Sequence, residues 1–285
     1  MQVDTANFGF RNDDGTLNEK AFTEKSTLAQ VKMVEVKLSQ GAKPGHGGLL
    51  PAAKNTNEIA NIRMVKAATD VFSPPVNPSF DSPEGLAHFI DKLRRLSGGK
   101  PVGFKLCIGS KDEFIGLIRA FEKTGIYPDF ITVDAAEGGT GAAPVEYSDS
   151  VGMRGEDALR FVHQTLREMG VRDRIKVIYS GKVITGFTLL KALCQGADLC
   201  NSARGFMFSL GCIQSLRCHT NTCPTGVATQ DKTLQKGLVP EEKYQRVANF
   251  HKNTIVSFLE LASALGISSL DELDEHHIQT GHTRL

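Results

Sequence analysis

The feature that most constrains the fold is the regular alternation of short apolar segments with amphipathic segments of helical periodicity. The runs at 102–107, 130–134 and 175–179 are apolar and have the length of buried strands. The intervening segments carry apolar residues at helical spacing, namely Leu86, Phe89, Ile90 and Leu93, then Phe114, Leu117, Ile118 and Phe121. Strands that alternate with helices usually pair in parallel, so the sequence predicts an α/β fold built from βαβ units.

The loops after the expected strands favour a barrel over a doubly wound sheet. They are rich in glycine or polar residues and read SQGAKPGHGG, EGGTGAAP, SGKVITG and SARG. A doubly wound sheet concentrates such loops at one switch point, whereas a (β/α)8 barrel distributes them around one mouth. We therefore predict a (β/α)8 fold of the TIM-barrel type with parallel strands. The expected strands lie at 31–38, 71–73, 102–107, 130–134, 175–179 and 198–202, about two fewer than a closed barrel requires.

The chain divides into a polar lead-in and one domain. Residues 1–29 are rich in Gly, Asp and Asn, which predicts a loosely structured segment with a short helix near 18–25. Residues 30–270 contain no linker, the chain has no low-complexity tract, and a long amphipathic helix stops near Gly266. We predict one barrel domain over 30–285.

The composition excludes several classes of protein. The 285 residues suffice for one large α/β domain, and 40% are hydrophobic and 23% charged, as is ordinary for a globular protein. The formal net charge of +1 provides no general basic surface for nucleic acid. No apolar run reaches the roughly 18 residues that span a membrane, and the polar start lacks a secretory pattern. We expect a cytoplasmic protein that binds neither nucleic acid nor membrane.

A loop at 211–230 contains three of the six cysteines, Cys212, Cys218 and Cys223. Iron–sulfur clusters are held by cysteine thiolates, and a Cys-Pro step, present here at Cys223-Pro224, is common in ferredoxins. Three cysteines without a fourth suggest a three-iron cluster.

Other interpretations of this loop stay open from the spacing alone. A structural zinc ion needs four ligands, and His219, the only neighbouring candidate, is adjacent to Cys218. Disulfides are disfavoured by the odd number of cysteines in the loop and the absence of a secretory signal. Inert thiols are the remaining alternative. The isolated Cys107, Cys194 and Cys200 lie in apolar segments and are expected in the core.

Two cations outside this loop have a structural and a functional interpretation. Lys105 interrupts an apolar strand, so it is either an edge-strand lysine or a cation at the barrel mouth. Arg204 follows the last expected strand, where barrels commonly build phosphate sites, but it could equally be a surface arginine.

The loop GCIQSLRCHTNTCPTGVATQ resembles the three-iron cluster loop of glutamate synthases. The match includes the unusual run His-Thr-Asn-Thr, and the resemblance extends over nearly the whole chain. It implies that Cys212, Cys218 and Cys223 ligate a [3Fe-4S] cluster. It also implies a longer protein or a shortened relative, because the barrels of this family carry their first two strands upstream of the segment VKMVEVKL.

The resemblance also assigns cofactor and substrate residues. Lys105 is expected beside the flavin of FMN, where it stabilises the reduced anionic ring. Gly138, Gly139 and Thr140 are expected to contact the flavin. The FMN phosphate is expected at Ser180, Gly181, Lys182, Arg204 and Gly205. The substrate contacts are expected at Gln40, Lys43 and Arg63.

The chain departs from the family pattern at several of these places. Most glutamate synthases read Asp-Gly-Gly and Gly-Thr where this chain has Ser-Gly-Lys and Ala-Arg-Gly. His46 replaces a glutamate and Leu49 replaces a glutamine at the substrate loop. Gln2 stands where the large enzymes have a catalytic cysteine of a glutaminase domain, so this chain is not expected to release ammonia from glutamine.

The expected function is that of an FMN- and [3Fe-4S]-dependent oxidoreductase. By resemblance, a donor protein or reductase subunit supplies electrons, and a 2-oxo acid, 2-oxoglutarate in the family, accepts ammonia to give L-glutamate. The ammonia is free or comes from a glutaminase partner. The alternatives are a flavin enzyme of the same fold with another substrate, an inactive incomplete barrel that needs a partner chain, and a small zinc-binding structural protein.

Overall fold

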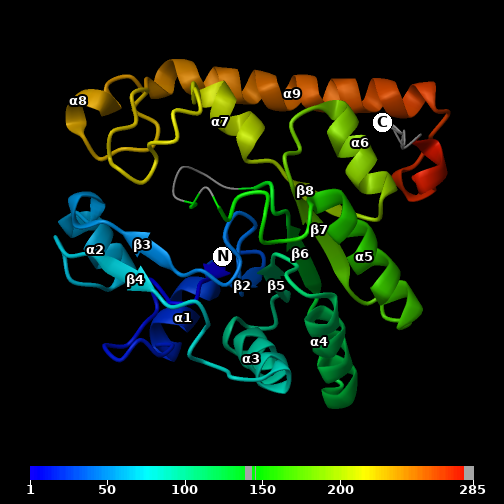
Figure 1. The fold of residues 1–285 in the computed structure, drawn as a ribbon, viewed down its shortest axis with the longest axis horizontal. Coiled ribbons are helices and arrows are strands. Elements are labelled where there is room, and N and C mark those ends of the chain that lie inside the picture. The colour runs from blue at the N-terminus through cyan, green and yellow to red at the C-terminus, as the bar shows by residue number, and fades with distance from the viewer. Residues whose placement is uncertain (139–142, 145, 279–285) are drawn as a thin grey trace.

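The computed structural model describes residues 1–138, 143–144 and 146–278. Its main sheet has six strands in the order β1-β2-β5-β6-β7-β8, and every neighbouring pair is parallel (Figure 1). The strands are β1 (Gln2–Val3), β2 (Val34–Lys37), β5 (Val102–Leu106), β6 (Phe130–Asp134), β7 (Lys176–Ser180) and β8 (Leu199–Asn201). The order follows the sequence without reversing, which is the winding of a barrel and not of a doubly wound sheet. The predicted fold class is confirmed.

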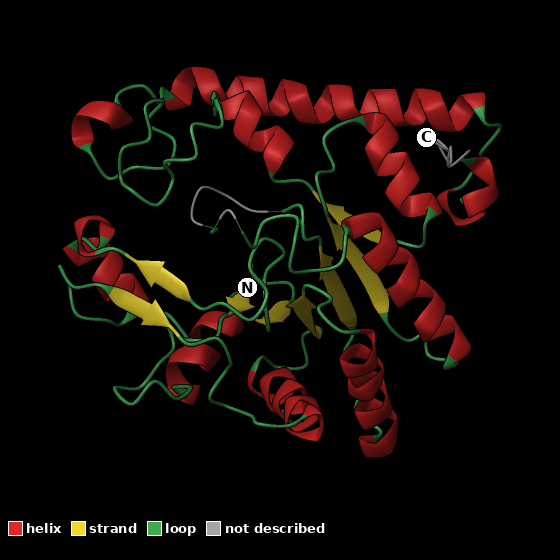
Figure 2. Ribbon diagram, viewed as in Figure 1, coloured by secondary structure: helices red, strands yellow, loops and turns green. Residues whose placement is uncertain are grey.

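Helices connect and cover these strands as the periodicity predicted. They are α3 (Pro83–Leu96), α4 (Lys111–Thr124), α5 (Gly155–Glu168) and α6 (Gly186–Cys194). Figure 2 shows α3, α4 and α5 on the outer face of the sheet. Ser82, Ser110 and Thr185 cap α3, α4 and α6, each by accepting a backbone N–H of the first turn.

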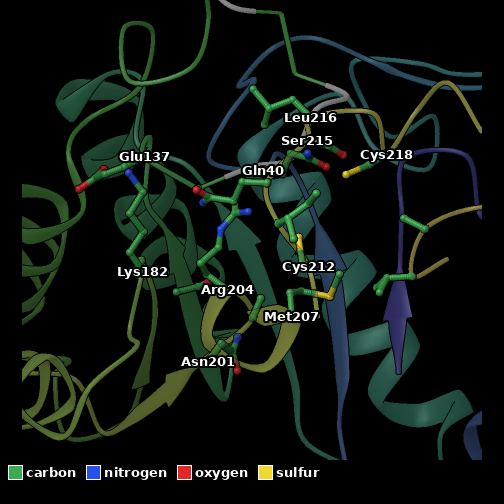
Figure 3. Close-up of a pocket in the computed structure, with 18 of the residues that line it drawn as sticks. Gln40, Glu137, Lys182, Asn201, Arg204, Met207, Cys212, Ser215, Leu216 and Cys218 are labelled. Atoms are coloured by element: carbon green, nitrogen blue, oxygen red, sulfur yellow. The ribbon is translucent and has the colours of Figure 1, made fainter. Parts of the chain in front are cut away.

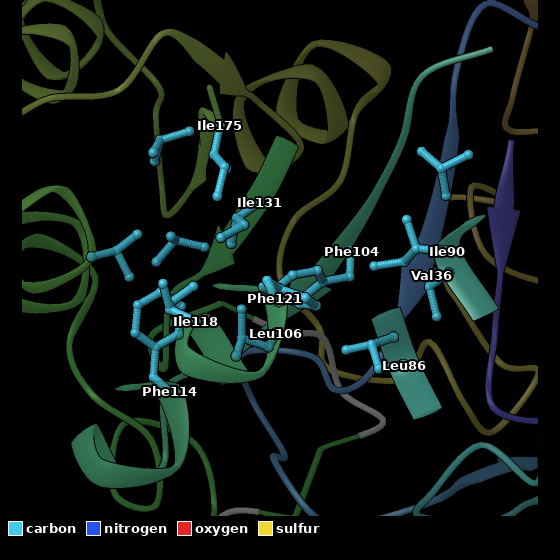
Figure 4. Packing of buried hydrophobic residues seen from close by; sticks show 14 of the residues in the cluster. Val36, Leu86, Ile90, Phe104, Leu106, Phe114, Ile118, Phe121, Ile131 and Ile175 are labelled. Carbon is cyan, nitrogen blue, oxygen red and sulfur yellow. The ribbon is translucent and has the colours of Figure 1, made fainter. Parts of the chain in front are cut away.

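The core lies between the outer face of the sheet and these helices (Figure 4). Phe104 of β5 and Ile131 of β6 are fully buried there, with Leu86 of α3 and Phe121 of α4 almost or fully buried against them. The rings of Phe104 and Phe121 lie 5.7 Å apart between centroids. Each such side chain contributes about 2 kcal/mol relative to its exposed state, so this layer holds the helices against the sheet.

The short helix predicted near 18–25 is confirmed by α1 (Glu19–Ser26), but the lead-in that contains it is not loosely structured as expected. Within residues 1–29, β1 pairs with β2, and α1 packs against α3. Val3 and Phe22 have no exposed surface, and Phe10 meets Phe22 edge to face at 5.7 Å. The apolar residues of this segment stand singly among polar ones, so they left no periodic pattern in the sequence, yet they complete the core.

One expected barrel strand lies elsewhere. β4 (Val71–Ser73) pairs antiparallel with β3 (Gly48–Leu50) and forms a hairpin apart from the main sheet. The short helices η1 (Ala52–Lys54) and α2 (Asn57–Arg63) lie between its strands. The predicted number of six strands therefore came from a partly wrong set, because β4 was counted and β1 was not. Within the described residues, β1 and β8 form the two edges of the main sheet and do not pair with each other.

The C-terminal part lies across one end of the sheet. It comprises α7 (Arg204–Leu210), α8 (Lys232–Gln235), α9 (Pro240–Ala264), η2 (Leu270–Glu272) and η3 (Glu275–His277). The long helix α9 packs against both α6 and α7 (Figure 1). Among the described residues, no helix combines the length and apolar character that a membrane span requires.

Candidate functional site

A cavity of about 320 Å³ lies at the carboxyl ends of the strands, under the cysteine loop (Figure 3). Its wall takes Lys105 from β5, Asp134 from β6, Ser180 from β7 and Asn201 from β8. The carboxyl ends of parallel strands meet at one edge of the sheet, which is where barrel enzymes build their active sites. The local sequence thus places these four side chains on one surface.

Most of the residues predicted for the site line this one cavity. They are Gln40, Lys105, Gly138, Ser180, Gly181, Lys182, Arg204, Cys212, Cys218 and Cys223. Figure 3 shows Gln40, Lys182 and Arg204 directed into it from three separate segments of the chain.

The structure does not bring the remaining predicted residues to the cavity wall. Lys43 lies in a small adjoining pocket that shares Gln40. Arg63 lies outside both pockets, with its guanidinium 4.9 Å from the ring centre of Phe8. Gly205 is buried in α7, where a Cβ would approach Cζ of the Phe250 ring to 2.4 Å. Gly139 and Thr140 lie outside the described residues.

Lys105 is not an edge-strand lysine. Its strand β5 lies between β2 and β6, and its side chain is 17% exposed. The Nζ of Lys105 is 3.9 Å from Oε1 of Glu35. Glu35 also accepts hydrogen bonds from Gln2 Nε2 and Thr132 Oγ1, both at 2.6 Å. A charged network therefore lies at the barrel mouth. The interior of such barrels is usually filled by bulky apolar side chains.

Lys37 is a second cation of this mouth that the sequence analysis missed. It stands opposite Lys105 in the pairing of β2 and β5, and its Nζ donates to Gln40 Oε1 at 2.8 Å. Burial, and then the positive charge of Lys105, lower the pKa of Lys37, and burial lowers the pKa of Lys43. The alternation VEVK in β2 could have indicated that Lys37 faces the barrel interior, because every second residue of a barrel strand does so.

Asp134 fixes the loop that carries Gln40. Its Oδ2 accepts the backbone N–H of Gly41 at 3.1 Å. A Cβ at Gly41 would lie 1.8 Å from the carbonyl oxygen of Ala135, so only glycine permits this approach. The loop after β2 is thereby held against the end of β6, and Gln40 reaches the cavity.

The loop after β7 is shaped by a glycine and a residue in the left-handed region. A Cβ at Gly181 would lie 2.2 Å from Tyr179 Oη, and Lys182 has φ +51°. This backbone turn lets Lys182 line the cavity together with Arg204 (Figure 3). Glu137 also lines the cavity, but both its oxygens accept the N–H of Gly155 at the start of α5. Its carboxylate therefore serves as a helix cap.

The cysteine loop places its three thiols on one wall of the cavity. Burial alone would raise the pKa of the Cys223 thiol, but hydrogen bonds from the Thr225 side chain and from nearby backbone N–H groups leave that pKa below its usual value. Burial instead raises the pKa of Cys107 and of Cys200 to about 12. Of these three thiols, Cys223 therefore loses its proton most readily, and iron–sulfur clusters bind the deprotonated form.

Within the described part of the chain, no group of three or more His, Cys, Asp or Glu residues is arranged to hold a metal ion. The donor set of three cysteines at one cavity suits a cluster, in which the thiolates bind different irons. The described cysteines are all free thiols.

The two substituted positions of the substrate loop have distinct surroundings. The ring of His46 meets Tyr147 edge to face at 5.3 Å between centroids. Leu49 is 51% exposed on β3 and lies opposite Phe72 of β4, which is also exposed. Leu49 therefore presents an apolar surface and no hydrogen-bonding group.

Comparison with known proteins adds to this geometry. A family model described as a conserved region in glutamate synthase matches residues 1–268. A glutamate synthase large subunit-like protein of Bacillus subtilis (strain 168) is 43% identical over 277 residues, which are 97% of this chain and 52% of that protein. An archaeal glutamate synthase (NADPH) of Methanocaldococcus jannaschii is 38% identical over 247 residues, 86% of this chain and 48% of that protein. The chain thus spans about half the length of these relatives.

Solved structures share the fold at low sequence identity. The recombinant flavin-binding domain of flavocytochrome b2 from baker's yeast superposes with a TM-score of 0.54 at 15% identity. The superposition covers 96% of this chain and 52% of that one. This likeness concerns the fold alone and agrees with the barrel-type winding of the sheet.

Proposed function

Because the chain belongs to the glutamate synthase family, we propose that it forms the FMN-binding barrel of an oxidoreductase that makes L-glutamate from 2-oxoglutarate and ammonia. One observation carries the proposal. A single cavity at the barrel mouth joins a nearly buried lysine, two further cations and three cysteine thiols from distant parts of the chain. Cations and thiols gathered in this way suit an anionic cofactor beside a metal cluster.

The cations can hold and tune FMN. Lys182 and Arg204 would bind the phosphate, since an ammonium and a guanidinium both recognise phosphate oxygens. Lys105 would face the flavin ring and favour negative charge on it. Bound FMN would supply hydride transfer, a chemistry that protein side chains lack. Glu35 and Thr132 would keep the Lys105 side chain in place.

The three thiols can hold the electron-transfer cluster. Cys212, Cys218 and Cys223 would ligate a [3Fe-4S] cluster on the cavity wall opposite the strands. An electron-donor protein or reductase subunit would supply the electrons, and free ammonia or a glutaminase partner would supply the nitrogen. We place these activities in the cytoplasm.

The substrate would bind where Gln40 and Lys43 meet. Lys37 and Lys43 supply the positive charge that a dicarboxylate needs, and Gln40 lies between their pocket and the main cavity. A second candidate is a different 2-oxo acid. Two observations favour it. The guanidinium of Arg63 packs on Phe8 and not in the pocket, and Leu49 offers an apolar surface where the family has glutamine.

An anaerobic absorption spectrum with FMN, iron and sulfide quantified tests the cofactor assignment. After reconstitution we expect about one FMN and about three irons per chain. The double variant Lys182→Met/Arg204→Met should lose FMN, whereas the exposed-site control Lys20→Met should retain it. A reconstituted chain without flavin or iron would refute the proposed function.

A substrate screen then separates the two candidates. The reduced protein is mixed anaerobically with ammonia and either 2-oxoglutarate or a monocarboxylic 2-oxo acid, and flavin reoxidation is followed. Faster reoxidation by 2-oxoglutarate supports glutamate formation. Faster reoxidation by the monocarboxylic acid supports the second candidate.

A further inference from the structure

Two loops that are far apart in the sequence meet beside the cavity. One is the short helix η1, which follows β3 after the loop with Gln40 and Lys43, and the other is the cysteine loop. Lys54, the last residue of η1, donates from Nζ to the carbonyl oxygen of Cys218 at 2.7 Å and to that of Ala228 at 3.5 Å. These two carbonyls lie at the two ends of the segment 218–228, which contains Cys223. One ammonium group therefore bridges the two ends of that segment.

Asn221 reinforces the same contact from the other side. Its Nδ2 donates to the carbonyl oxygen of Ala53 at 3.5 Å. Its Oδ1 accepts the backbone N–H of Gln230 at 2.7 Å, and its carbonyl oxygen accepts the Thr229 hydroxyl at 2.6 Å. Asn221 has φ +65°, a left-handed conformation that asparagine tolerates better than most residues. Hydrogen bonds of Asn221 to Thr229 and Gln230 therefore stabilise the cysteine loop from within. Its bond to Ala53 joins the loop to η1.

Ala228 links Lys54 to the surroundings of Cys223. Its carbonyl oxygen accepts from Lys54, and Ala228 lines the same cavity as Cys223. If the Lys54 side chain moved, the backbone at Cys218 would lose its hydrogen bond. The backbone near Cys223 would be affected through Ala228.

The charge of Lys54 is directed at this loop alone. Within the described residues its ammonium forms no salt bridge with a carboxylate, and it donates to the two loop carbonyls. The side chain is half-buried. A cation in such a place stabilises negative charge more than an exposed one does, because solvent screens it less.

We propose that Lys54 is a positioning residue that fastens the cysteine loop to η1 and holds Cys218 and Cys223 in place for the cluster. The inference rests on the proposed cluster for its functional meaning, but the tie between the loops belongs to the protein itself. Removal of Lys54 frees the segment with Cys218 and Cys223 and leaves Cys212 unaffected, because Cys212 lies outside the segment that Lys54 closes. It also removes a positive charge next to a cluster that gains negative charge on reduction.

The first experiment uses the protein without its cluster. Alkylation of each cysteine by iodoacetamide is timed by mass spectrometry in wild type, Lys54→Met and Lys54→Arg. In Lys54→Met we expect Cys218 and Cys223 to react about tenfold faster, the factor that one charged hydrogen bond corresponds to. Arginine keeps the charge and the donors, so Lys54→Arg should restore most of the protection.

Three controls belong to this experiment. Cys212 should react at the wild-type rate in every variant. The buried Cys107 should stay unreactive, which shows that the barrel is intact. Lys66→Met, at an exposed lysine of the same region, should match wild type. Equal rates at Cys218 and Cys223 in wild type and Lys54→Met would overturn the proposal.

The second experiment uses the reconstituted protein. The reduction potential of the cluster should be more negative in Lys54→Met and close to wild type in Lys54→Arg. An unchanged potential with faster cluster loss would still support the tie but would remove the electrostatic part of the proposal. If wild type takes up no cluster, the proposed function fails, and the alkylation rates alone decide the role of Lys54.

Discussion

The carboxylate of Glu35 joins four neighbouring strands of the barrel mouth. It accepts hydrogen bonds from Gln2 of β1 and Thr132 of β6, and it lies 3.9 Å from the Lys105 ammonium of β5. One side chain of β2 thus holds the edge strand and orients the central lysine. Without it, the buried Thr132, the partly buried Lys105 and the exposed Gln2 would each lose a partner.

Replacement of Glu35 by alanine should lower the free energy of unfolding by about 2 kcal/mol, because buried polar groups left without partners are costly. Glu35→Gln should cost less, since an amide still accepts from Gln2 or donates to Thr132. Urea unfolding checks both, with the exposed Glu24→Ala as control. An equal loss in the alanine variants of Glu35 and Glu24 would contradict the network.

His163 gives the protein a defined pH dependence. Its Nδ1 accepts from Arg172 Nε at 3.1 Å, which requires a neutral ring. Burial, then the charges of Arg172 and Arg167, lower its pKa below the usual 6.5, although Glu275 and Asp198 oppose this. When the pH falls below about 6.5, the unfolded chain binds a proton at this site and the folded chain does not. The free energy of unfolding should therefore fall with pH.

The variant His163→Gln isolates this contribution. Glutamine can still accept from Arg172 but does not titrate. Between about pH 7.5 and 5.5, wild type should lose more stability than His163→Gln in urea unfolding. Parallel pH profiles for the two proteins would show that His163 does not control this range.

At the scale of the elements, two glycines let the long helix α9 approach the barrel. A Cβ at Gly205 of α7 would lie 2.4 Å from Phe250 Cζ, and one at Gly186 of α6 would lie 2.5 Å from the backbone nitrogen of Phe258. Both helices follow the strands whose ends carry the candidate phosphate site. The packing of α9 therefore fixes the cavity wall around Arg204.

Alanine at these glycines should overpack the contact. Gly205→Ala should lower the free energy of unfolding by about 2 kcal/mol, and Phe250→Leu in the same chain should recover part of it. Gly186→Ala should cost at least as much, because backbone atoms cannot move aside. Gly116→Ala in α4 has open space and should be neutral or stabilising. Chemical unfolding of the four variants tests this ranking, and a loss at Gly116 equal to that at Gly205 would contradict it.

At the scale of the whole molecule, stability is concentrated in the middle of the sheet. β5, β6 and β7 have five residues each and largely buried side chains, whereas the edges β1 and β8 have two and three. Leu199 of β8 is 55% exposed. The edges should open more readily than the centre.

Hydrogen exchange followed by mass spectrometry checks this distribution. Peptides from β5, β6 and β7 should exchange slowest, at the rate of global unfolding, and peptides from β1 and β8 faster by at least about tenfold. Uniform protection across the sheet would show that the edges are held by something other than their own pairing.

Much of the architecture was predictable because it depends on local patterns. The apolar strands and the helical stripes, such as Leu86 to Leu93, gave the parallel α/β fold and the barrel-type winding. The ordered packing of residues 1–29 was not predictable, because the burial of Val3 and Phe22 depends on contacts with distant segments of the chain. β4 was assigned to the barrel because a strand of three residues is too short for its sequence to distinguish a hairpin from a barrel strand.

The sequence alone determined which candidate groups stand in the loops and near the strand ends, since the cysteine spacing and the positions of Lys105, Lys182 and Arg204 are local features. Only the tertiary structure decided which groups meet. It brought Lys37, Glu35 and Asp134 to the mouth, placed Lys54 on the cysteine loop and left Arg63 against Phe8. The physical reason is that strand register and loop closure are set by packing across the whole core, which no single segment encodes.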